Sequence, residues 1–440
     1  MWTGRFEAKV YSMPLPLLSM AFRFVNARRS RREGECAPMS LKLGRACCTV
    51  LSLALIVAPL WGQTRTLTNA EAKLAAGDED NSDTQMASLS PAIQPAAIRA
   101  AMKKVADWQI AHSEEKFNQD WTYAPLYLGL LSASRTTGEA RYYNAVLRAA
   151  ERFNWKFWAN REFFADDEAV GQAYAMLYLE DHSLRRIADM QATFDGLVAR
   201  HDEPQKDLWW WCDALFMAPA GLAQMTSITG DHKYVDKMNA EWDLTTKHLF
   251  VPEDDLYLRD LSYVGKTEAN GKQIFWGRGN GWVIAGAVNT LKALPKEDTS
   301  RAKFEMLLKR MSRRVAGLQQ PDGLWHTGLL DQKAYPLPEL SGSAFFTYAI
   351  SWGINEGLLD RNQYGPVVEK AWAGMIAHVF ADGRLGCIQP VGAAPGAFGA
   401  TSSYVYGVGA FLLAGSEMDR YAARSTGKPN GKHRTSSSPR

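Results

Sequence analysis

The sequence is poor in cysteine and lacks the motifs that hold metal ions. Three of its five cysteines, Cys36, Cys47 and Cys48, precede residue 63 of the 440-residue chain. The other two, Cys212 and Cys387, could pair only if the fold brought their Cα atoms within bonding range, which the sequence leaves open. There is no CxxC motif and no Cys/His cluster with metal-ligand spacing. We therefore expect neither a zinc site nor any other metal or cofactor.

The chain also lacks an excess of positive charge in its central part. The formal net charge is +3, but residues 1–63 contain nine Lys or Arg against three Glu, and residues 421–440 contain five Lys or Arg and no acidic residue. The remaining residues, 64–420, therefore carry a net charge of −8. An acidic body with basic ends gives no basis for a nucleic-acid partner.

Long apolar runs are scarce, and the clearest one follows Met39. Lys42 and Arg45 precede an apolar stretch at 47–60, which is the layout of a secretory signal peptide and is short for a membrane span. We expect a periplasmic or secreted protein without a stable membrane span after processing. A single N-terminal anchor is the alternative.

The signal-like segment sets the expected boundaries. Residues 1–38 form an upstream extension, 39–63 the signal peptide, 64–92 a polar linker, 93–420 the folded body and 421–440 a disordered basic tail. The oligomeric state is left open.

Aromatic residues, in contrast, are abundant: the chain has 15 Trp, 16 Tyr and 18 Phe. Aromatic faces pack well against sugar rings, so this richness is compatible with a carbohydrate site. A large aromatic core would explain the same composition, and composition alone favours the core.

Apolar spacing predicts an almost entirely helical body. Helices are expected at 93–113, 122–135, 139–157, 167–180, 184–200, 212–228, 231–248, 280–294, 301–316, 341–357, 364–379 and 403–418. The second helix of each pair is apolar nearly all round, whereas the first has one apolar stripe and a charged face. This alternation predicts an all-α (α/α)6 toroid, six inner helices inside six outer ones, and a two-domain helical bundle is the alternative.

In such a toroid all inner helices begin at one end, where their starting segments should line a shared funnel. These segments are 120–129, 163–172, 208–217, 275–282 and 336–346. Asp213 lies at one such start, after three tryptophans, and is either a helix cap or a catalytic acid and base. Asp166 and Asp167 open another inner helix, and one of them is expected to be only a cap. Two carboxyl sites around one pocket are the minimum for glycosidic chemistry.

Candidate binding residues surround these carboxylates in the sequence. Arg278 lies in a Gly-rich segment, FWGRGNGW, where it either binds a carboxylate or pairs with an acidic neighbour in a tight turn. The further candidates for sugar binding are Trp121, Trp210, Trp211, Asn280, Trp282 and His326.

The motifs ADDEAVGQAY, WWWCDALFMAP, FWGRGNGW, PDGLWHTGLLD and ELSGSAFFTYAISWGI, in this order, resemble the unsaturated rhamnogalacturonyl hydrolases, glycoside hydrolase family 105. That family is related to the unsaturated glucuronyl hydrolases of family 88, and the resemblance covers about 95–420. It implies an (α/α)6 barrel, no metal, Asp213 as general acid and base, and Asp166 or Asp167, with a slight preference for Asp167, as a second carboxylate. Arg278 and Trp282 would help to bind the sugar, and Arg259 or Asp260 stands where some members carry a histidine.

The resemblance also implies the chemistry. The substrate would be an oligosaccharide whose terminal galacturonyl residue has a C4=C5 double bond, as in rhamnogalacturonan (pectin) fragments. Protonation of C4 and capture of C5 by water would give a hemiketal that opens and releases the neighbouring sugar. The alternatives are an unsaturated glucuronyl hydrolase acting on glycosaminoglycan fragments, a non-catalytic sugar-binding toroid, and an ordinary glycosidase or polysaccharide lyase.

Overall fold

The computed structural model describes residues 77–78, 85–158, 161–200 and 207–425. The expected extension and signal peptide, and the tail beyond Ser425, lie outside the described residues. All described residues belong to the unit formed by 63–440. Within them, no helix combines the length and apolarity needed to cross a membrane.

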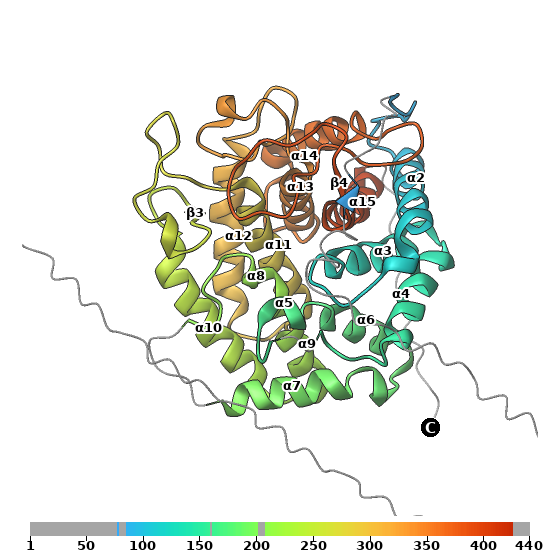
Figure 1. Ribbon diagram of the computed structural model, residues 1–440, viewed down its shortest axis with the longest axis vertical. Coiled ribbons are helices and arrows are strands. Elements are labelled where there is room, and N and C mark those ends of the chain that lie inside the picture. The colour runs from blue at the N-terminus through green and yellow to red at the C-terminus, as the bar shows by residue number, and fades with distance from the viewer. Residues whose placement is uncertain (1–76, 79–84, 159–160, 201–206, 426–440) are drawn as a thin grey trace, which may run out of the picture. The chain divides into compact units, whose positions relative to one another are not determined.

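Twelve of the described helices form two concentric rings (Figure 1). Each inner helix contacts the next, and the last contacts the first, so the inner ring closes. The prediction of an (α/α)6 toroid is confirmed. The inner helices are α3 (Ala124–Thr137), α6 (Gly171–Asp181), α9 (Pro219–Thr229), α11 (Gly277–Ala293), α13 (Leu340–Asn355) and α15 (Val405–Ser425), and the outer ones are α2 (Pro95–Ser113), α4 (Ala140–Arg152), α7 (Ala188–Ala199), α10 (Lys233–Leu249), α12 (Arg301–Ala316) and α14 (Arg361–Ile376).

The two rings differ in burial as their sequences predict. Every residue of α13 is buried, because this helix packs against neighbours on all sides. In α12 only one face is buried, and its basic residues lie outside that face. Small residues let the inner helices approach closely: a Cβ at Gly409 of α15 would lie 2.2 Å from the Pro125 backbone of α3.

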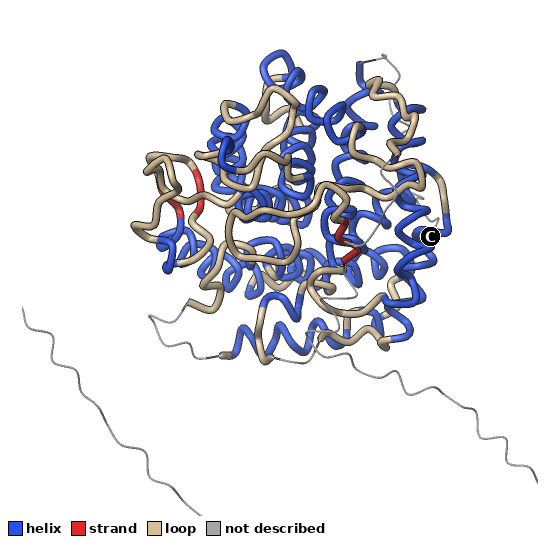
Figure 2. Tube along the Cα trace, turned by 45° about the horizontal axis from the view of Figure 1, so that its top comes forward, coloured by secondary structure: helices blue, strands red, loops and turns tan. Residues whose placement is uncertain are grey.

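Short elements complete the described fold, and strands are confined to two small ladders (Figure 2). They are the one-turn helices α5 (Ala165–Glu168) and α8 (Ala214–Met217), the 3-10 turns η1 (Glu114–Lys116), η2 (Leu184–Arg186), η3 (Leu261–Tyr263) and η4 (Gln332–Ala334), and the strands β1 (Gly77–Asp78), β2 (Phe250–Val251), β3 (Leu256–Tyr257) and β4 (Ser403–Tyr404). β1 pairs with β4 and β2 with β3, both antiparallel.

Several expected helix boundaries are wrong. The helix expected at 212–228 breaks into α8 and α9 at Pro219, whose missing N–H and ring favour the start of a new helix over the continuation of an old one. The glycines before Trp282 lie inside α11, which begins at Gly277, and not in a loop before it.

The ends of the folded body also extend further than expected. α15 continues to Ser425 and so passes through the boundary set at residue 420. In the segment expected to be a linker, the Ala87 N–H donates to the Val379 carbonyl at 2.8 Å. Residues beyond the predicted limits therefore pair with the body.

The connections between helices differ strongly at the two ends of the inner ring. At the end where inner helices begin, here called the site end, the connections are long and include 250–276, 317–339 and 377–404. At the other end, here called the turn end, Gly138 and Gly230 close α3 and α9 in left-handed conformation with φ of 78° and 76°. Long loops therefore gather at the site end.

Candidate functional site

Asp213 lies at the start of α8, at the site end of the ring. It occupies the N-cap position, but its side chain makes no capping hydrogen bond. The residue is only 7% exposed. The cap interpretation therefore does not account for this carboxylate, and its chemistry has to be explained by its other neighbours.

Those neighbours are one thiol and two cations. The Cys212 Sγ lies 3.5 Å from Oδ2 of Asp213, and the Arg259 Nε lies 3.8 Å from the same oxygen. Burial raises the pKa of Asp213, and the positive charges of Arg259 and Arg278 oppose that rise. The result is a carboxyl group that holds its proton to higher pH than an exposed aspartate does.

Asp166 belongs to the same electrostatic cluster. Burial raises its pKa to about 7, although Arg161 opposes the rise, and the charges of Asp213 and Asp120 add to it. Its side chain is 16% exposed, and its Oδ2 lies 3.6 Å from the Arg161 Nη2. The charge of Asp213 thus acts on Asp166, so the two carboxyl groups belong to one electrostatic neighbourhood.

Asp167 makes different contacts, although it is the next residue. Its Oδ2 accepts a 2.7 Å hydrogen bond from the Arg161 backbone N–H, and its Oδ1 accepts a 3.1 Å bond from the Arg161 Nε. The residue is 4% exposed. This geometry shows that Asp167 fixes Arg161.

Two further acidic residues of this cluster were not singled out from the sequence. Asp120 precedes α3 and is 6% exposed, and its Oδ1 accepts hydrogen bonds from the Thr122 N–H at 3.0 Å and hydroxyl at 2.6 Å. Its place before an inner helix, like that of Asp213, was the signal available. Glu168 is 3% exposed, and burial together with the charges of Asp167 and Asp166 raises its pKa to about 8.

Arg259 connects the catalytic candidate with the rim of the site. Its Nη1 donates to Asp260 at 2.7 Å, and its guanidinium lies 5.2 Å from the centre of the Trp210 ring. Trp210 is 45% exposed, so it offers a flat face to solvent close to Asp213. Asp260 also caps the 3-10 turn η3 by accepting from the Ser262 N–H at 2.8 Å.

The remaining tryptophan candidates differ in how deeply they are buried at the site end. Trp211 stacks on Phe164 at 4.6 Å and is 3% exposed. Trp121 is half-buried, stacks on Tyr406 at 5.7 Å and meets Trp282 edge-on at 5.9 Å. Trp282 itself is fully buried, so it supports the floor of the site end and presents no face to a sugar.

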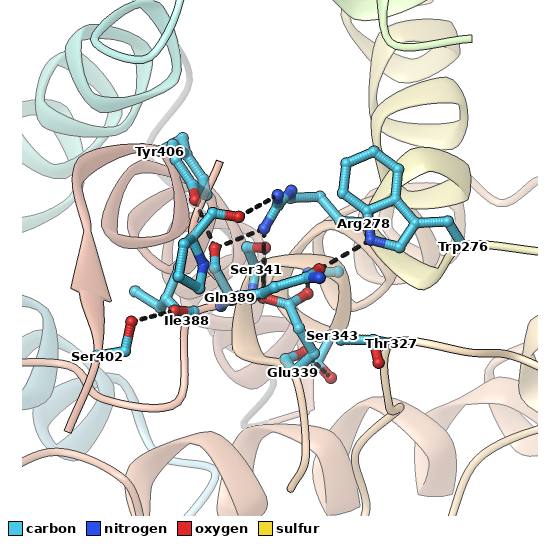
Figure 3. Close-up of polar contacts among 12 residues, drawn as sticks. Trp276, Arg278, Thr327, Glu339, Ser341, Ser343, Ile388, Gln389, Ser402 and Tyr406 are labelled. Carbon is cyan, nitrogen blue, oxygen red and sulfur yellow. Dashed lines mark hydrogen bonds and ion pairs between the residues drawn. The ribbon is translucent and has the colours of Figure 1, made fainter. Parts of the chain in front are cut away.

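Arg278 has a different role from the one expected. It is fully buried, and its Nη1 and Nη2 donate to the carbonyls of Gln389 and Pro390 at 2.6 and 2.7 Å (Figure 3). Both terminal nitrogens are therefore used by the backbone before α15. Substrate binding by Arg278 is replaced by a positioning role, while its charge still acts on Asp213.

The same network ties three inner helices together (Figure 3). Glu339 accepts from the N–H groups of Ser341, Gly342 and Gln389 at 2.7 to 3.1 Å, and the Trp276 Nε1 donates to the Gln389 side chain at 2.8 Å. The starts of α11 and α13 are thus fixed to the segment that leads into α15.

Asn280 and His326 also turn out to hold loops. Asn280 is fully buried and exchanges hydrogen bonds with the Tyr257 backbone, at 2.8 Å to its N–H and 3.0 Å to its carbonyl. The His326 Nδ1 bonds the carbonyls of Gln332 and Tyr335 at 3.1 and 2.5 Å. In the structure both side chains therefore hold backbone segments in place.

Two observations about cysteine and metal ligands hold for the residues that the structure describes. Cys212 and Cys387 are both buried and free, so they do not form a disulfide with each other. In the described ranges, no three His, Cys, Asp or Glu side chains are grouped so that they could hold a metal ion.

Comparison with known proteins identifies the family. The model of Glycosyl Hydrolase Family 88 matches residues 97–422. The chain belongs to this family. It is therefore a glycoside hydrolase, and the resemblance to families 105 and 88 is confirmed.

The most informative relatives are bacterial. The chain is 38% identical to an unsaturated 3S-rhamnoglycuronyl hydrolase of Formosa agariphila, over 73% of this chain and 90% of that protein. It is 33% identical to a protein of the same name from an Alteromonas species, over 73% and 86%. A solved family 88 structure from Bacteroides vulgatus aligns with a TM-score of 0.71 and 32% identity, covering 74% of this chain and 99% of that one.

Proposed function

We propose that this glycoside hydrolase removes a terminal 4,5-unsaturated uronyl residue from rhamnose-containing oligosaccharides, as in fragments of rhamnogalacturonan. The observation that carries the proposal is Asp213, a buried carboxyl group whose side chain makes no capping bond, whose pKa is raised and whose charge acts on Asp166. The names of the two relatives support an unsaturated uronyl group joined to rhamnose.

The C4=C5 double bond makes the ring oxygen part of a vinyl ether, and this sets the chemistry. The protonated Asp213 donates its proton to C4, which leaves an oxocarbenium-like cation at C5. The resulting carboxylate then accepts a proton from water as the water oxygen bonds to C5. The hemiketal opens and releases the rhamnose-bearing fragment, so one water is consumed in each turnover.

The surrounding residues have distinct parts in this proposal. We infer that Asp166, rather than Asp167, is the second active-site carboxylate and holds or orients the water. Trp210 stacks on a sugar at the rim, with Arg259 held between Asp213 and Asp260. Glucuronate and galacturonate differ only at C4, where the unsaturated residue has no stereocentre, so linkage and the neighbouring sugar must provide the selectivity.

The test measures loss of the ultraviolet absorbance of the double bond with unsaturated uronyl-rhamnose as substrate. Asp213→Asn should lower kcat by about 10²–10⁴-fold, the range for a general acid–base group. Asp236→Asn, an exposed aspartate on α10 that is 71% exposed, is the matched control and should be unaffected. Full activity of Asp213→Asn would falsify the assignment.

A panel of substrates separates the alternative functions. One arm carries a 3-O-sulfate on rhamnose, because both relatives have the prefix 3S in their names. A second arm is an unsaturated glycosaminoglycan disaccharide, for which we expect little turnover. Binding of every sugar without turnover would point to a non-catalytic toroid, and cleavage of saturated substrate to an ordinary glycosidase.

We further propose that the mature enzyme is periplasmic or secreted and binds no nucleic acid. The basic residues Lys42 and Arg45 and the apolar run at 47–60 support export. Expression of the full chain, fractionation and N-terminal sequencing of the product provide the test. A product that stays in the cytoplasm with its N-terminus intact would contradict this proposal.

A further inference from the structure

A second cavity lies at the turn end of the inner ring. Its volume is about 420 Å³, within the range of small-molecule pockets. All six inner helices line it, through Leu128, Met176, Ile228, Lys292, Tyr348 and Leu413 among others. A cavity built from every inner helix lies on the axis of the ring, and its walls are mainly apolar.

The floor of this cavity is a fixed polar chain. The Tyr348 hydroxyl donates to the Asn289 Oδ1 at 2.7 Å, and the Asn289 Nδ2 donates to the Gln172 Oε1 at 3.2 Å. The Gln172 Nε2 in turn donates to the carbonyls of Phe216 and Met217 at 2.8 and 3.0 Å. These bonds fix the polar side chains that line the cavity.

The cavity is distant from the carboxylate cluster. Lys292 follows Arg278 by fourteen residues on α11, a rise of about 21 Å along the helix axis. Arg278 lies at the site end and Lys292 lines the cavity. The two sites are therefore distinct.

Lys292 gives the cavity a charge that is only loosely compensated. Its Nζ lies 3.4 Å from both the Tyr348 hydroxyl and the Glu417 Oε1, which is long for a bond to an ammonium group. Glu417 is bound more closely by Arg420 at 2.7 Å and by Asn355 at 3.0 Å. The Lys292 side chain is 41% exposed and lines the cavity, so a ligand in the cavity would contact it.

Lys292 also keeps its charge at neutral pH. Burial alone would lower the pKa of its ammonium group, but Tyr348 and Glu417 outweigh burial and raise it. An ammonium beside apolar walls of this size complements a carboxylate that carries an aliphatic body.

We propose that the turn-end cavity binds a small amphipathic monocarboxylate, with the carboxylate on Lys292 and the aliphatic body against Leu128, Met176, Ile228 and Leu413. This site is independent of the sugar site and does not depend on the function proposed above. It is a binding site with no chemistry of its own.

The probe is octanoate, titrated into the full-length protein by isothermal calorimetry. We expect saturable one-to-one binding with a negative heat-capacity change from apolar burial. Neutral octanamide has the same aliphatic body and should bind at least tenfold more weakly. Lys292→Met keeps the unbranched shape, removes the charge and should weaken octanoate binding at least tenfold without changing turnover of the sugar substrate.

A second variant guards against a change in folding at Lys292. Ser227 lines the mouth of the cavity and is exposed, so Ser227→Trp should block entry without loss of the folded state. Circular dichroism checks that both variants are folded. Absence of saturable binding by wild type, or octanoate binding as tight as wild type in either variant, would overturn the proposal. Displacement of octanoate from Asp213→Asn by the unsaturated disaccharide would also overturn it.

Discussion

The two ends of the inner ring carry the same helices but opposite kinds of electrostatics. At the site end, Asp213 and Asp166 are largely buried, and burial raises the pKa of both. At the turn end, charges such as Arg135 and Glu180 pair at 2.8 Å with side chains about half exposed. Burying carboxyl groups of like charge opposes folding, whereas exposed ion pairs change stability little. The arrangement at the site end therefore lowers stability where the chemistry requires buried carboxyl groups.

The sharpest test of this difference compares two adjacent site-end carboxylates. Asp166→Asn should lower kcat by about 10²-fold or more while the folded state is kept, because we propose that Asp166 orients the reacting water beside Asp213. Asp167→Asn should instead lower the melting temperature, because it loosens Arg161. Steady-state kinetics and thermal melting of both variants provide the measurement, and the reverse pattern would restore Asp167 as the second active-site carboxylate.

Replacing one arginine at each end of the ring should lower the free energy of unfolding by different amounts. Arg278→Met leaves the Gln389 and Pro390 carbonyls without their donors in a buried site and should lower the free energy of unfolding by about 3 kcal/mol. Arg135→Met removes an exposed ion pair and should cost less than about 1 kcal/mol. Urea unfolding measures both, and equal costs would remove the distinction between the two ends.

The raised pKa of Glu168 predicts that the stability of the protein depends on pH. Its pKa in the folded state is about 8, above the ordinary glutamate value of 4.5, so between these pH values the unfolded chain has lost a proton that the folded chain keeps. This group should make the free energy of unfolding fall by up to about 1.4 kcal/mol per pH unit as pH rises through that window. Glu168→Gln should reduce this slope in urea titrations at several pH values. An unchanged slope would show that Glu168 does not titrate there.

Arg259 offers a test through the pH profile of turnover. Its charge lowers the pKa of Asp213, so Arg259→Met should raise that pKa and move the alkaline limb of kcat to higher pH. A purely structural role would lower the rate without moving the limb. Profiles of wild type and variant distinguish the two results.

The smallest expected effect concerns the exposed rim. Trp210→Ala should raise KM by about two- to tenfold with little change in kcat, because it removes a stacking face and leaves the acid in place. Leu179→Ala, which changes an exposed apolar residue of the turn end, is the control. A large loss of kcat in Trp210→Ala would mean that the ring orders the reacting groups.

Much of the fold follows from local patterns. Helices apolar on all sides and helices with one apolar stripe alternate along the chain, and this alternation is sufficient to predict an inner and an outer ring. The order of the rings then places Asp213, Asp166 and the tryptophans at one end. The break before α9 was missed because the apolar pattern continues from α8 into α9.

Residue identity and spacing determined the double ring of helices, the common end of the inner helix starts and the candidate Asp213. Only the tertiary structure decided that Arg278 holds the Gln389 and Pro390 carbonyls, that Asp167 accepts hydrogen bonds from Arg161, and that Cys212 and Cys387 stay apart. The physical reason is how far apart in the sequence the interacting residues lie. Helical periodicity is set by neighbours within a few residues, whereas the partner of a buried charge can lie more than a hundred residues away in the chain.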